Sequence, residues 1–264
     1  MKVVYLNENS TFDSSNLVIA LGFFDGFHKG HISVIDKAVE IARKKNAKSC
    51  VLTFSTSIIS FINNEKFKYL TSLDDKVDLC LQRGVDEIAI ITPTLDFINQ
   101  SKEEFYDKYL KDSLALVVGF DYSFAKNKSG TPEYLKSLKE TYVIDELKIN
   151  SLKVGSYQIK EFLSLGDIES ANLFLGREYS LKGKIYKRNK YYAMSLQDYF
   201  IPRSGFYHLK VVFGENKKEF DAKIKTLDDK TGIIFKEIEK NEVLSEFNLK
   251  NVEVFLTKSS SKNL

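Results

Sequence analysis

The chain has 264 residues, 43% of them hydrophobic, which is enough apolar material for one large core or two smaller ones and favours one or two domains. Its 39 basic and 36 acidic residues leave a net charge of +3 and are spread along the chain, so the composition offers no basic stripe for nucleic acid. A run of ~18 apolar residues that would cross a membrane is also missing, and the polar opening segment does not have the apolar run of a signal peptide.

The first half of the chain is predicted to alternate strands and helices. Residues 16–23, NLVIALGF, are a short apolar run of β-branched character, and residues 31–47 then place apolar side chains at helical spacing. The alternation continues with strands expected at 48–54, 86–92 and 114–120 and helices expected at 72–84 and 101–112. Ser72 is the expected N-cap and Gly84 the expected C-cap of the first of these helices, and Ser101 caps the second.

The strands from Val51 onward are apolar on both faces, which is typical of parallel strands covered by helices on each side. The sequence therefore predicts an α/β domain with a doubly wound parallel sheet. Ligands of such sheets bind beyond the carboxyl ends of the strands. Two glycine-bearing loops, residues 21–31 and 117–130, begin at such ends, and we expect them to face one crevice.

From about Tyr179 the pattern changes to short segments of alternating apolar and polar residues, without long helical stretches. Such segments are typical of a small barrel or meander, and GENKK, residues 214–218, is the expected turn of a hairpin. A short amphipathic helix within residues 164–179 joins the two parts. We place the boundary near Leu175, which gives domains of residues 1–175 and 176–264.

Two isolated cysteines, Cys50 and Cys80, each lie inside an apolar periodic segment. In a chain of this size they predict buried thiols in a reducing compartment. We therefore expect a cytoplasmic protein with small-molecule ligands and with neither a nucleic-acid nor a membrane partner. The sequence does not indicate an oligomeric state.

The loop LGFFDGFHKGH contains two of the three histidines, His28 and His31, together with three glycines and an aspartate. A helix start presents unpaired N–H groups and the positive end of the helix dipole, and glycines let an anion approach the backbone. Imidazoles one helical turn apart point toward the same volume, where they would stabilise charge on a transferring phosphoryl or nucleotidyl group. The pattern favours a site for a phosphate-containing ligand.

Two other interpretations of the histidines stay open at this point. In the first, both are surface or helix-capping residues. In the second, they are a zinc pair, but zinc sites need at least one more protein ligand. The remaining histidine, His208, lies in the second predicted domain.

The same loop resembles the G-x-F-D-G-x-H-x-G-H signature of the prokaryotic FAD synthetases, the bifunctional riboflavin kinase/FMN adenylyltransferases, within the wider H-x-G-H nucleotidyltransferase superfamily. Residues 69–91, 117–135 and 166–185 are also similar to segments of that family, so the resemblance extends over roughly residues 18–185. It implies a Rossmann-like nucleotidyltransferase domain followed by a β-barrel similar to riboflavin kinase.

In this family the adenylyltransferase joins FMN to ATP in the presence of Mg²⁺ and gives FAD and pyrophosphate. The resemblance implies that His28 and His31 are catalytic, contacting the ATP phosphates and stabilising charge at the α-phosphorus. Asp25 would lie near the phosphates or their magnesium, while Phe24 is equally interpreted as a core residue. The residues implied to bind nucleotide or phosphate are Gly22, Phe24, Asp25, Gly26, Gly30, Ser156 and Lys160.

The resemblance places a second group of residues on the flavin side of the site, in the loop after residue 118. The family has an arginine and a glycine where this chain has Ser123 and Ala125, and KNKSG, residues 126–130, is equally interpreted as a solvated turn. The residues implied for the flavin side are Gly119, Asp121, Phe124 and Lys126.

A third family motif, I-S-S-T-x-I-R, corresponds to VGSYQIK, residues 154–160. Ser156 is kept, but Tyr157 replaces the threonine and Lys160 replaces the arginine. Lysine keeps the charge and loses the bidentate fork. The Tyr157 ring fills volume where a small hydroxyl would bind phosphate, so either ATP binds differently or activity is reduced.

The second domain lacks the catalytic motif of the family's riboflavin kinases. That motif is a glycine-rich segment ending in G-x-P-T-A-N, followed by a catalytic glutamate, whereas residues 184–202 contain no glycine and no P-T-A-N. Glu237 and Glu239 lie downstream, in a segment better interpreted as solvated and charged. We therefore expect a barrel without riboflavin kinase activity.

Three functions are compatible with these residues. The first is an FMN adenylyltransferase whose barrel is kept for stability, flavin capture or association. The second is a non-catalytic flavin or nucleotide binder, suggested by Tyr157, Lys160, Ser123 and the degenerate barrel. The third is a nucleotidyltransferase with another phosphate acceptor. The intact H-x-G-H favours an enzyme, because a binder has no need of two donors for a transition state.

Overall fold

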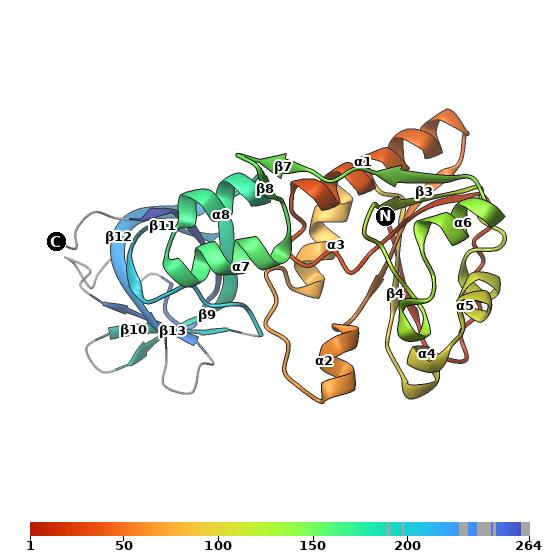
Figure 1. The fold of residues 1–264 in the computed structure, drawn as a ribbon. Helices are drawn as coiled ribbons and strands as arrows, with labels where there is room; N and C mark the ends of the chain where they lie inside the picture. Colours follow the sequence, from red (N-terminus) through yellow and green to blue (C-terminus); the bar gives the residue numbers. More distant parts are fainter. Residues whose placement is uncertain (189–190, 197, 227–231, 237–243, 245–246, 260–264) are drawn as a thin grey trace. The chain divides into compact units, whose positions relative to one another are not determined.

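Contacts between residues divide the chain into two units (Figure 1). Unit 1 comprises Met1–Phe67 and Thr71–Lys153, and unit 2 comprises Lys68–Leu70 and Val154–Leu264. The structure is a computed structural model that describes residues 1–188, 191–196, 198–226, 232–236, 244 and 247–259. Within these residues no helix is long and apolar enough to cross a membrane.

Unit 1 is built on a six-stranded sheet in which every neighbouring pair of strands is parallel. The strands are β1 (Lys2–Leu6), β2 (Leu17–Leu21), β3 (Lys48–Phe54), β4 (Glu87–Ile91), β5 (Ala115–Gly119) and β6 (Thr141–Ile144), in the order β1-β4-β3-β2-β5-β6. All residues of β2 and of β4 are buried. The parallel α/β sheet predicted from the sequence is therefore confirmed.

Helices cover both faces of this sheet (Figure 1). On one face, side chains of α1 (Lys29–Lys44) and α3 (Leu73–Gln82) share a core with one set of strand side chains. On the other, α4 (Leu95–Asn99), α5 (Lys102–Tyr109) and α6 (Pro132–Leu138) pack on the opposite set. Shorter elements of unit 1 are α2 (Ile58–Asn63), the 3₁₀ turn η1 (Lys126–Lys128) and the pair β7 (Lys148–Ile149) and β8 (Leu152–Lys153).

Local capping explains where the helices of unit 1 begin. Ser72 and Ser101 each form a reciprocal capping box, with Asp75 and Glu104 respectively, as the serines predicted. The helix after Ser72 ends one residue earlier than expected, because Arg83 is the C-cap and Gly84 follows it in the left-handed conformation at φ 73°.

The described residues of unit 2 form two α-helices and a closed six-stranded barrel. The helices are α7 (Ser156–Leu165) and α8 (Ile168–Leu175). The strands are β9 (Tyr179–Arg188), β10 (Tyr191–Leu196), β11 (Gly205–Phe213), β12 (Asn216–Thr226), β13 (Gly232–Lys236) and β14 (Asn251–Ser259), closed in the order β10-β13-β12-β11-β14-β9. Phe213 pairs with Asn216 across a two-residue turn, so the hairpin predicted at 214–218 is confirmed.

Side chains that point into this barrel alternate along its strands with side chains that point outward. In β11, for example, Tyr207, Leu209 and Val211 are buried while their sequence neighbours are at least partly exposed. The helices pack with the barrel, since α8 contacts both β14 and β9, and Phe162 of α7 meets Phe174 of α8 edge to face. By residue contacts, the main part of unit 2 therefore begins at Val154. The boundary near Leu175, which the sequence suggests between the first predicted domain and the barrel, stays a prediction.

Residues Lys68–Leu70 belong to unit 2 although the chain on both sides belongs to unit 1. The Tyr69 N–H donates to the Asp198 carbonyl at 2.7 Å, and the Phe200 N–H donates to the Tyr69 carbonyl at 2.7 Å. Tyr69 thereby forms a parallel bridge with Tyr199. The chain thus enters unit 2 twice, once through this short segment and once through α7.

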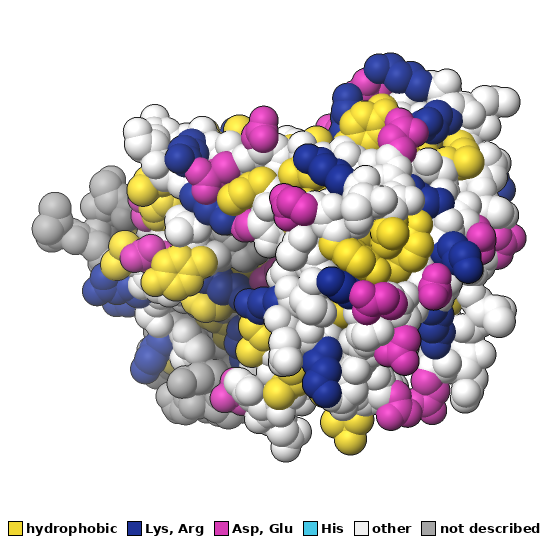
Figure 2. All heavy atoms as spheres, turned by 45° about the vertical axis from the view of Figure 1, so that its right-hand side comes forward, with side chains coloured by type: hydrophobic (Ala, Val, Ile, Leu, Met, Phe, Trp, Pro, Cys, Tyr) yellow, Lys and Arg dark blue, Asp and Glu magenta, His cyan; other side chains and the backbone are white. Residues whose placement is uncertain are grey.

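Charged side chains of both signs lie beside one another over the face drawn in Figure 2. Several pair across elements of unit 1, such as Arg43 with Asp86 and Lys45 with Glu140, both at 2.7 Å. The thiols of Cys50 and Cys80 are free and buried, as their apolar surroundings predicted.

Gly183 of β9 offers a test of the barrel. A Cβ added there would lie 2.1 Å from the backbone oxygen of Ser195, which belongs to the β9–β10 ladder and cannot move away without breaking it. We expect Gly183→Ala to lower the free energy of unfolding by about 1–3 kcal/mol or more, measured by denaturant unfolding. Gly214→Ala is the control, because open space surrounds Gly214 and only its φ of 56° opposes alanine. Equal losses in the two variants would contradict the close packing of β9 on β10.

Candidate functional site

The two glycine-bearing loops follow neighbouring strands of the sheet. From β2 the chain builds outward to β3 and β4 on one side and later to β5 and β6 on the other, so the direction of winding reverses between β2 and β5. Val18, Ile19 and Ala20 of β2 pair directly with residues of β5. The carboxyl ends of these strands thus flank the switch point where open α/β sheets bind ligands, which agrees with the expectation that the loops face one region.

The loop after β2, residues 22–28, has a strained backbone. Phe24, Gly26 and Phe27 all have positive φ, at 55°, 84° and 43°. Such angles are unfavourable for phenylalanine and persist only where the surroundings fix them. Both rings are buried in the core, Phe24 at 2% and Phe27 at 1% exposure, so burial fixes this loop. Of the two interpretations of Phe24, the core residue is thus the one that its position favours.

Gly22 is required by that packing. A Cβ at Gly22 would lie 2.8 Å from ring atoms of Phe24. The same Phe24 ring meets the imidazole of His31 edge to face, with centroids 5.2 Å apart. Gly22 and Gly26 therefore shape the loop independently of any ligand, while Gly30 lies in the first turn of α1.

His28 and His31 lie together at the N-terminus of α1. His28 is the N-cap, and its Nδ1 accepts the backbone N–H of His31 at 3.3 Å. In a neutral His28 ring the proton must then be on Nε2. The two rings stack with centroids 3.6 Å apart and planes 19° apart. The spacing in the sequence predicted that both would point to one volume, and this is confirmed.

Two side chains from neighbouring elements support the loop through the carbonyl oxygen of Phe23. Thr53 of β3 donates to it from Oγ1 at 3.1 Å, and Lys76 of α3 donates from Nζ at 2.7 Å. The Lys76 ammonium also lies 4.0 Å from the centroid of the Phe23 ring. Burial lowers the pKa of Lys76 to about 8, against the opposing effect of the Asp25 carboxylate.

Asp25 is 3% exposed and acts electrostatically on Lys76. Among the described residues no three or more His, Cys, Asp or Glu side chains gather in a way that would hold a metal ion. Mg²⁺ is commonly held by one or two carboxylates together with substrate phosphates, so Asp25 could contribute one oxygen ligand beside a nucleotide. The zinc interpretation of the histidines finds no third ligand among the same residues.

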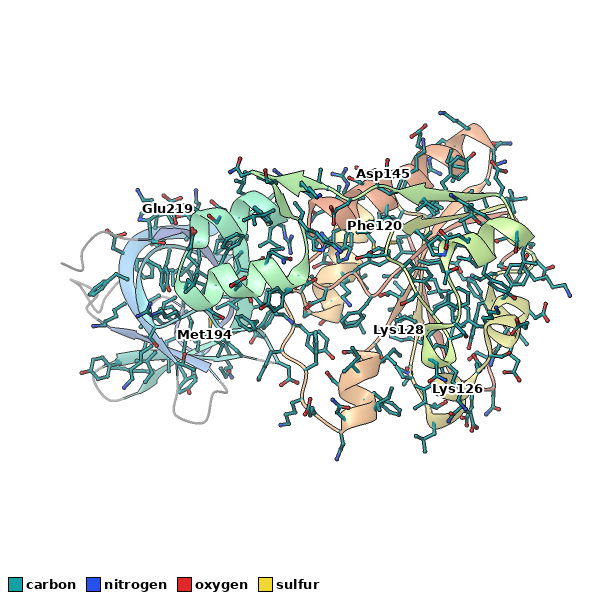
Figure 3. The ribbon with its side chains drawn as sticks, viewed as in Figure 1. Phe120, Lys126, Lys128, Asp145, Met194 and Glu219 are labelled. Carbon is teal, nitrogen blue, oxygen red and sulfur yellow. The ribbon has the colours of Figure 1, made fainter. Side chains whose placement is uncertain are left out.

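The loop after β5 exposes an aromatic ring and several charges (Figure 3). Phe120 is 41% exposed, and the Lys153 ammonium lies 4.6 Å from its ring centroid. Lys153 also pairs with Asp121 at 2.6 Å. A Cβ at Gly119 would meet only the Asp121 side chain at an ordinary 3.5 Å, so packing within the protein does not require a glycine there.

The remaining residues of this loop form a closed turn. Phe124 and Gly130 exchange two backbone hydrogen bonds, and a Cβ at Gly130 would lie 2.3 Å from the Phe124 ring. Phe124 is 6% exposed and belongs to the core, whereas Lys126 is exposed in η1. Ala125 has φ 62° and ψ 179°, a conformation nearly confined to glycine, and it stands where the family has glycine.

The third predicted motif lies at the start of α7, in unit 2. Gly155 is the N-cap and provides no side-chain cap, and Ser156 begins the helix. The Tyr157 ring is 73% exposed, and the Lys160 ammonium lies 5.8 Å from the ring centroid of Phe200. The role of Ser156 and Lys160 with ATP stays a prediction.

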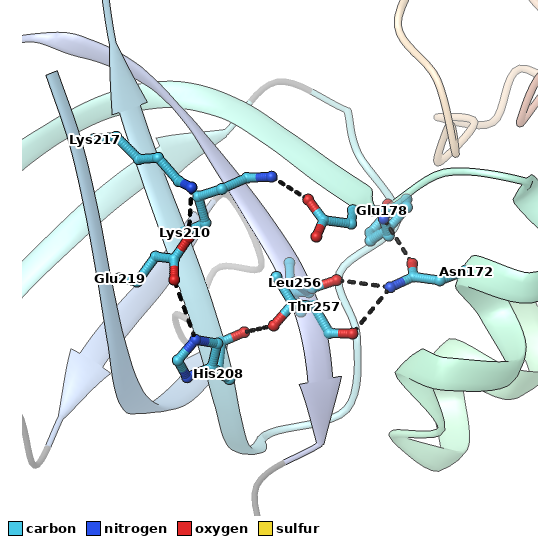
Figure 4. Close-up of polar contacts among 9 residues, drawn as sticks. Asn172, Glu178, His208, Lys210, Lys217, Glu219, Leu256 and Thr257 are labelled. Atoms are coloured by element: carbon cyan, nitrogen blue, oxygen red, sulfur yellow. Dashed lines mark hydrogen bonds and ion pairs between the residues drawn. The ribbon is translucent and has the colours of Figure 1, made fainter. Parts of the chain in front are cut away.

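His208, the third histidine, belongs to a charged ladder on the outer face of the barrel (Figure 4). Its Nδ1 lies 2.9 Å from Asp221 Oδ1, and its backbone oxygen accepts from the Thr257 hydroxyl at 3.1 Å. Lys217 pairs with Glu219 at 2.7 Å beside it. These contacts give His208 a structural role in strand pairing. Glu237 and Glu239 lie outside the described residues.

Thr53 and Lys76, the two side chains that support the histidine loop, belong to none of the motifs found in the sequence. Lys76 carries one visible signal, because it occupies a position in α3 that the apolar period assigns to the buried face. Thr53 carries none, because a threonine near the end of an apolar strand is common. Only the fold brings either side chain to the Phe23 carbonyl.

Comparison with known proteins identifies close counterparts. The family model for FAD synthetase matches residues 11–161. A bifunctional riboflavin kinase/FMN adenylyltransferase of Listeria monocytogenes is 35% identical over 233 residues, which cover 80% of this chain and 73% of the relative. A protein of the same organism named FAD synthetase is 25% identical over 216 residues, covering 78% of this chain and 86% of the relative.

A crystal structure described as a macrolide-efflux protein from Streptococcus pneumoniae has a TM-score of 0.85 at 22% identity, covering 98% of this chain and 91% of that chain. At this identity the likeness establishes the fold alone. The family assignment rests on the matched sequence model, which covers more than half of the chain, and on the Listeria relative. It confirms the resemblance inferred from the histidine loop: the chain belongs to the FAD synthetase family.

Proposed function

We propose that this chain is an FMN adenylyltransferase, which transfers AMP from ATP to FMN and releases pyrophosphate. The observation that supports it best is the stacked pair His28 and His31 at the N-terminus of α1, beside the switch point of the sheet. The relatives named as FMN adenylyltransferase and FAD synthetase are consistent with this activity.

The chemistry needs no side-chain nucleophile. The FMN phosphate is largely ionised at neutral pH, because its second pKa is about 6. One of its oxygens attacks the α-phosphorus of ATP, a new P–O bond forms, and the bond from the α-phosphorus to the bridging oxygen breaks as pyrophosphate leaves. Catalysis is then positioning and charge stabilisation. The imidazoles of His28 and His31 and the first N–H groups of α1 supply donors for that charge.

Magnesium would enter together with ATP. Mg²⁺ is commonly held by one or two carboxylates and the substrate phosphates, so a dedicated cage of protein ligands is not needed. Asp25 is the carboxylate nearest in sequence to the histidines, but it is buried and acts on Lys76. The ion would neutralise phosphate charge, with Asp25 at most an additional ligand.

The flavin side of the proposed site is the loop after β5. Gly119 supports this assignment, because no packing contact within the protein requires glycine at that position. Asp121 and the exposed Lys126 would face solvent or ligand, whereas Phe124 holds the base of the loop. Phe120 is also exposed in this loop.

We further propose that the chain lacks riboflavin kinase activity. The barrel is closed, but residues 184–202 contain neither the glycine-rich segment nor P-T-A-N. The Listeria relative named bifunctional and the one named FAD synthetase both match most of this chain, so relatives of either kind are compatible with it. The adenylyltransferase domain is proposed to span residues 1–175 and the non-catalytic barrel residues 176–264, in a cytoplasmic protein.

One observation favours a second candidate, a non-catalytic binder of flavin or nucleotide. Tyr157 and Lys160 replace a threonine and an arginine of the family motif, and the Tyr157 ring is exposed at the helix start where phosphate is expected.

A product assay separates the candidates: the protein with Mg²⁺ and ATP is given FMN in one tube and riboflavin in another. FAD from FMN alone supports the proposal, FMN from riboflavin contradicts the loss of kinase activity, and no product favours the binder.

Replacing either imidazole tests the catalytic role. We expect His28→Ala and His31→Ala each to lower kcat by ~100-fold or more with little change in FMN affinity, because the donors act on charge that develops in the transition state. Steady-state formation of FAD gives kcat, and titration of flavin fluorescence gives affinity. His208→Ala, in the barrel, is the matched control. An unchanged kcat in both loop variants would remove the pair from the mechanism.

Tyr157→Thr tests the departure in the third motif. The ring is 73% exposed, so its removal should not affect stability, and we expect a lower KM for ATP or a higher kcat. Tyr5→Thr is the control, since Tyr5 is 62% exposed on β1. Unchanged kinetic constants in Tyr157→Thr would mean that ATP binding already accommodates the ring.

A further inference from the structure

The side chain of Lys76 is buried in a way that is rare for lysine. It is 2% exposed, on α3, and burial of an ammonium group is costly unless partners compensate it. Its Nζ donates to the Phe23 carbonyl at 2.7 Å and lies over the Phe23 ring at 4.0 Å. Both contacts are with the residue that opens the strained part of the histidine loop.

Two groups from different elements, Asp25 and Cys80, affect the pKa of Lys76. Asp25 in the loop favours the charged ammonium, while Cys80 lies one turn further along α3. Burial raises the pKa of the Cys80 thiol to about 12, so this thiol is neutral at ordinary pH. The charge that Lys76 balances is therefore that of Asp25, which is itself 3% exposed.

The contact between Lys76 and the Phe23 carbonyl lies five residues before His28 in the chain, at the start of the strained backbone. Phe24, Gly26 and Phe27 follow Phe23 directly, all with positive φ, and His28 comes next as the N-cap of α1. A backbone in such conformations keeps its shape only when contacts on several sides determine it. Lys76 supplies one such contact from α3, and Thr53 supplies another from β3.

We propose that Lys76 is a positioning residue of the adenylyl-transfer site. Its ammonium anchors the Phe23 carbonyl and balances the buried Asp25 charge, and in this way sets where His28 and His31 lie. The proposal rests on the proposed function for its effect on turnover, but not for its effect on the two imidazoles. An uncharged side chain of the same length would fill the volume and would neither anchor the carbonyl nor balance Asp25.

The decisive variant is Lys76→Met in the full-length protein, compared with two matched controls. One control is Cys80→Ala, which loosens the packing of the same helix without touching the loop, and the other is Gly84→Ala, just beyond the C-cap of that helix, where open space surrounds the glycine. We expect Lys76→Met to lower kcat at least about tenfold while KM for ATP and FMN changes much less, since small misplacements of catalytic groups affect turnover strongly. We expect both controls to keep kcat within about threefold.

A second measurement does not require activity. The chain has three histidines, so the imidazole resonances of His28, His31 and His208 can be followed by NMR. Lys76→Met should shift the signals of His28 and His31 and leave that of His208 in place. If Lys76→Met does not fold, Lys76→Gln serves instead, because it keeps a donor and loses the charge.

The outcomes separate the two proposals. If the wild-type protein forms no FAD, the proposed function is contradicted. The NMR shifts of His28 and His31 then still test whether Lys76 positions the two imidazoles. Unchanged His28 and His31 signals in a folded Lys76 variant overturn the positioning role. So does a loss of kcat in Cys80→Ala equal to that in Lys76→Met, because general loosening of α3 would then explain both.

Discussion

The pairing of β2 with β3 on one side and β5 on the other is the constraint on which the site depends. β2 is buried along its whole length, so its position in the middle of the sheet is fixed by apolar contacts on both faces. Because winding reverses there, the loops after β2 and β5 emerge side by side. The histidine loop and the loop proposed for the flavin side therefore follow two neighbouring strands.

The histidine loop illustrates how a core can determine a functional backbone. Phe24 and Phe27 are aromatic residues in left-handed conformations, which cost of order 1–3 kcal/mol each. Burial of both rings offsets that cost, since a fully buried phenylalanine contributes roughly 1.5–3 kcal/mol. The hydrogen bonds from Thr53 and Lys76 then fix the carbonyl at the loop's beginning. Packing of the two rings and these hydrogen bonds thus determine the backbone that leads to His28.

The barrel closes without the sequence motif that the resemblance assigns to the family's riboflavin kinases. Its closure depends on alternating buried side chains and on backbone ladders, and β10 joins these ladders from within residues 184–202, which contain neither the glycine-rich segment nor P-T-A-N. The paired helices α7 and α8 and the segment Lys68–Leu70 both pack with the barrel. Loss of the barrel would therefore remove the packing partners of chain segments that precede it, which is a physical reason for its retention.

The sequence by itself determined the alternation of strands and helices, the parallel sheet, a β-rich second part that is a barrel or a meander, and the loop with the two histidines, because these follow from hydrophobic period, capping residues and glycine spacing. The resemblance to the family selected the barrel. Shorter elements such as α2 and the edge strand β1 were not predicted, since their side chains are mostly exposed and leave no clear period. Only the tertiary structure decided that Phe24 and Phe124 are core residues, that the imidazoles stack, and that Lys76 lies beneath the loop. These facts depend on contacts between residues far apart in the chain, and local sequence patterns do not record which distant side chains will meet.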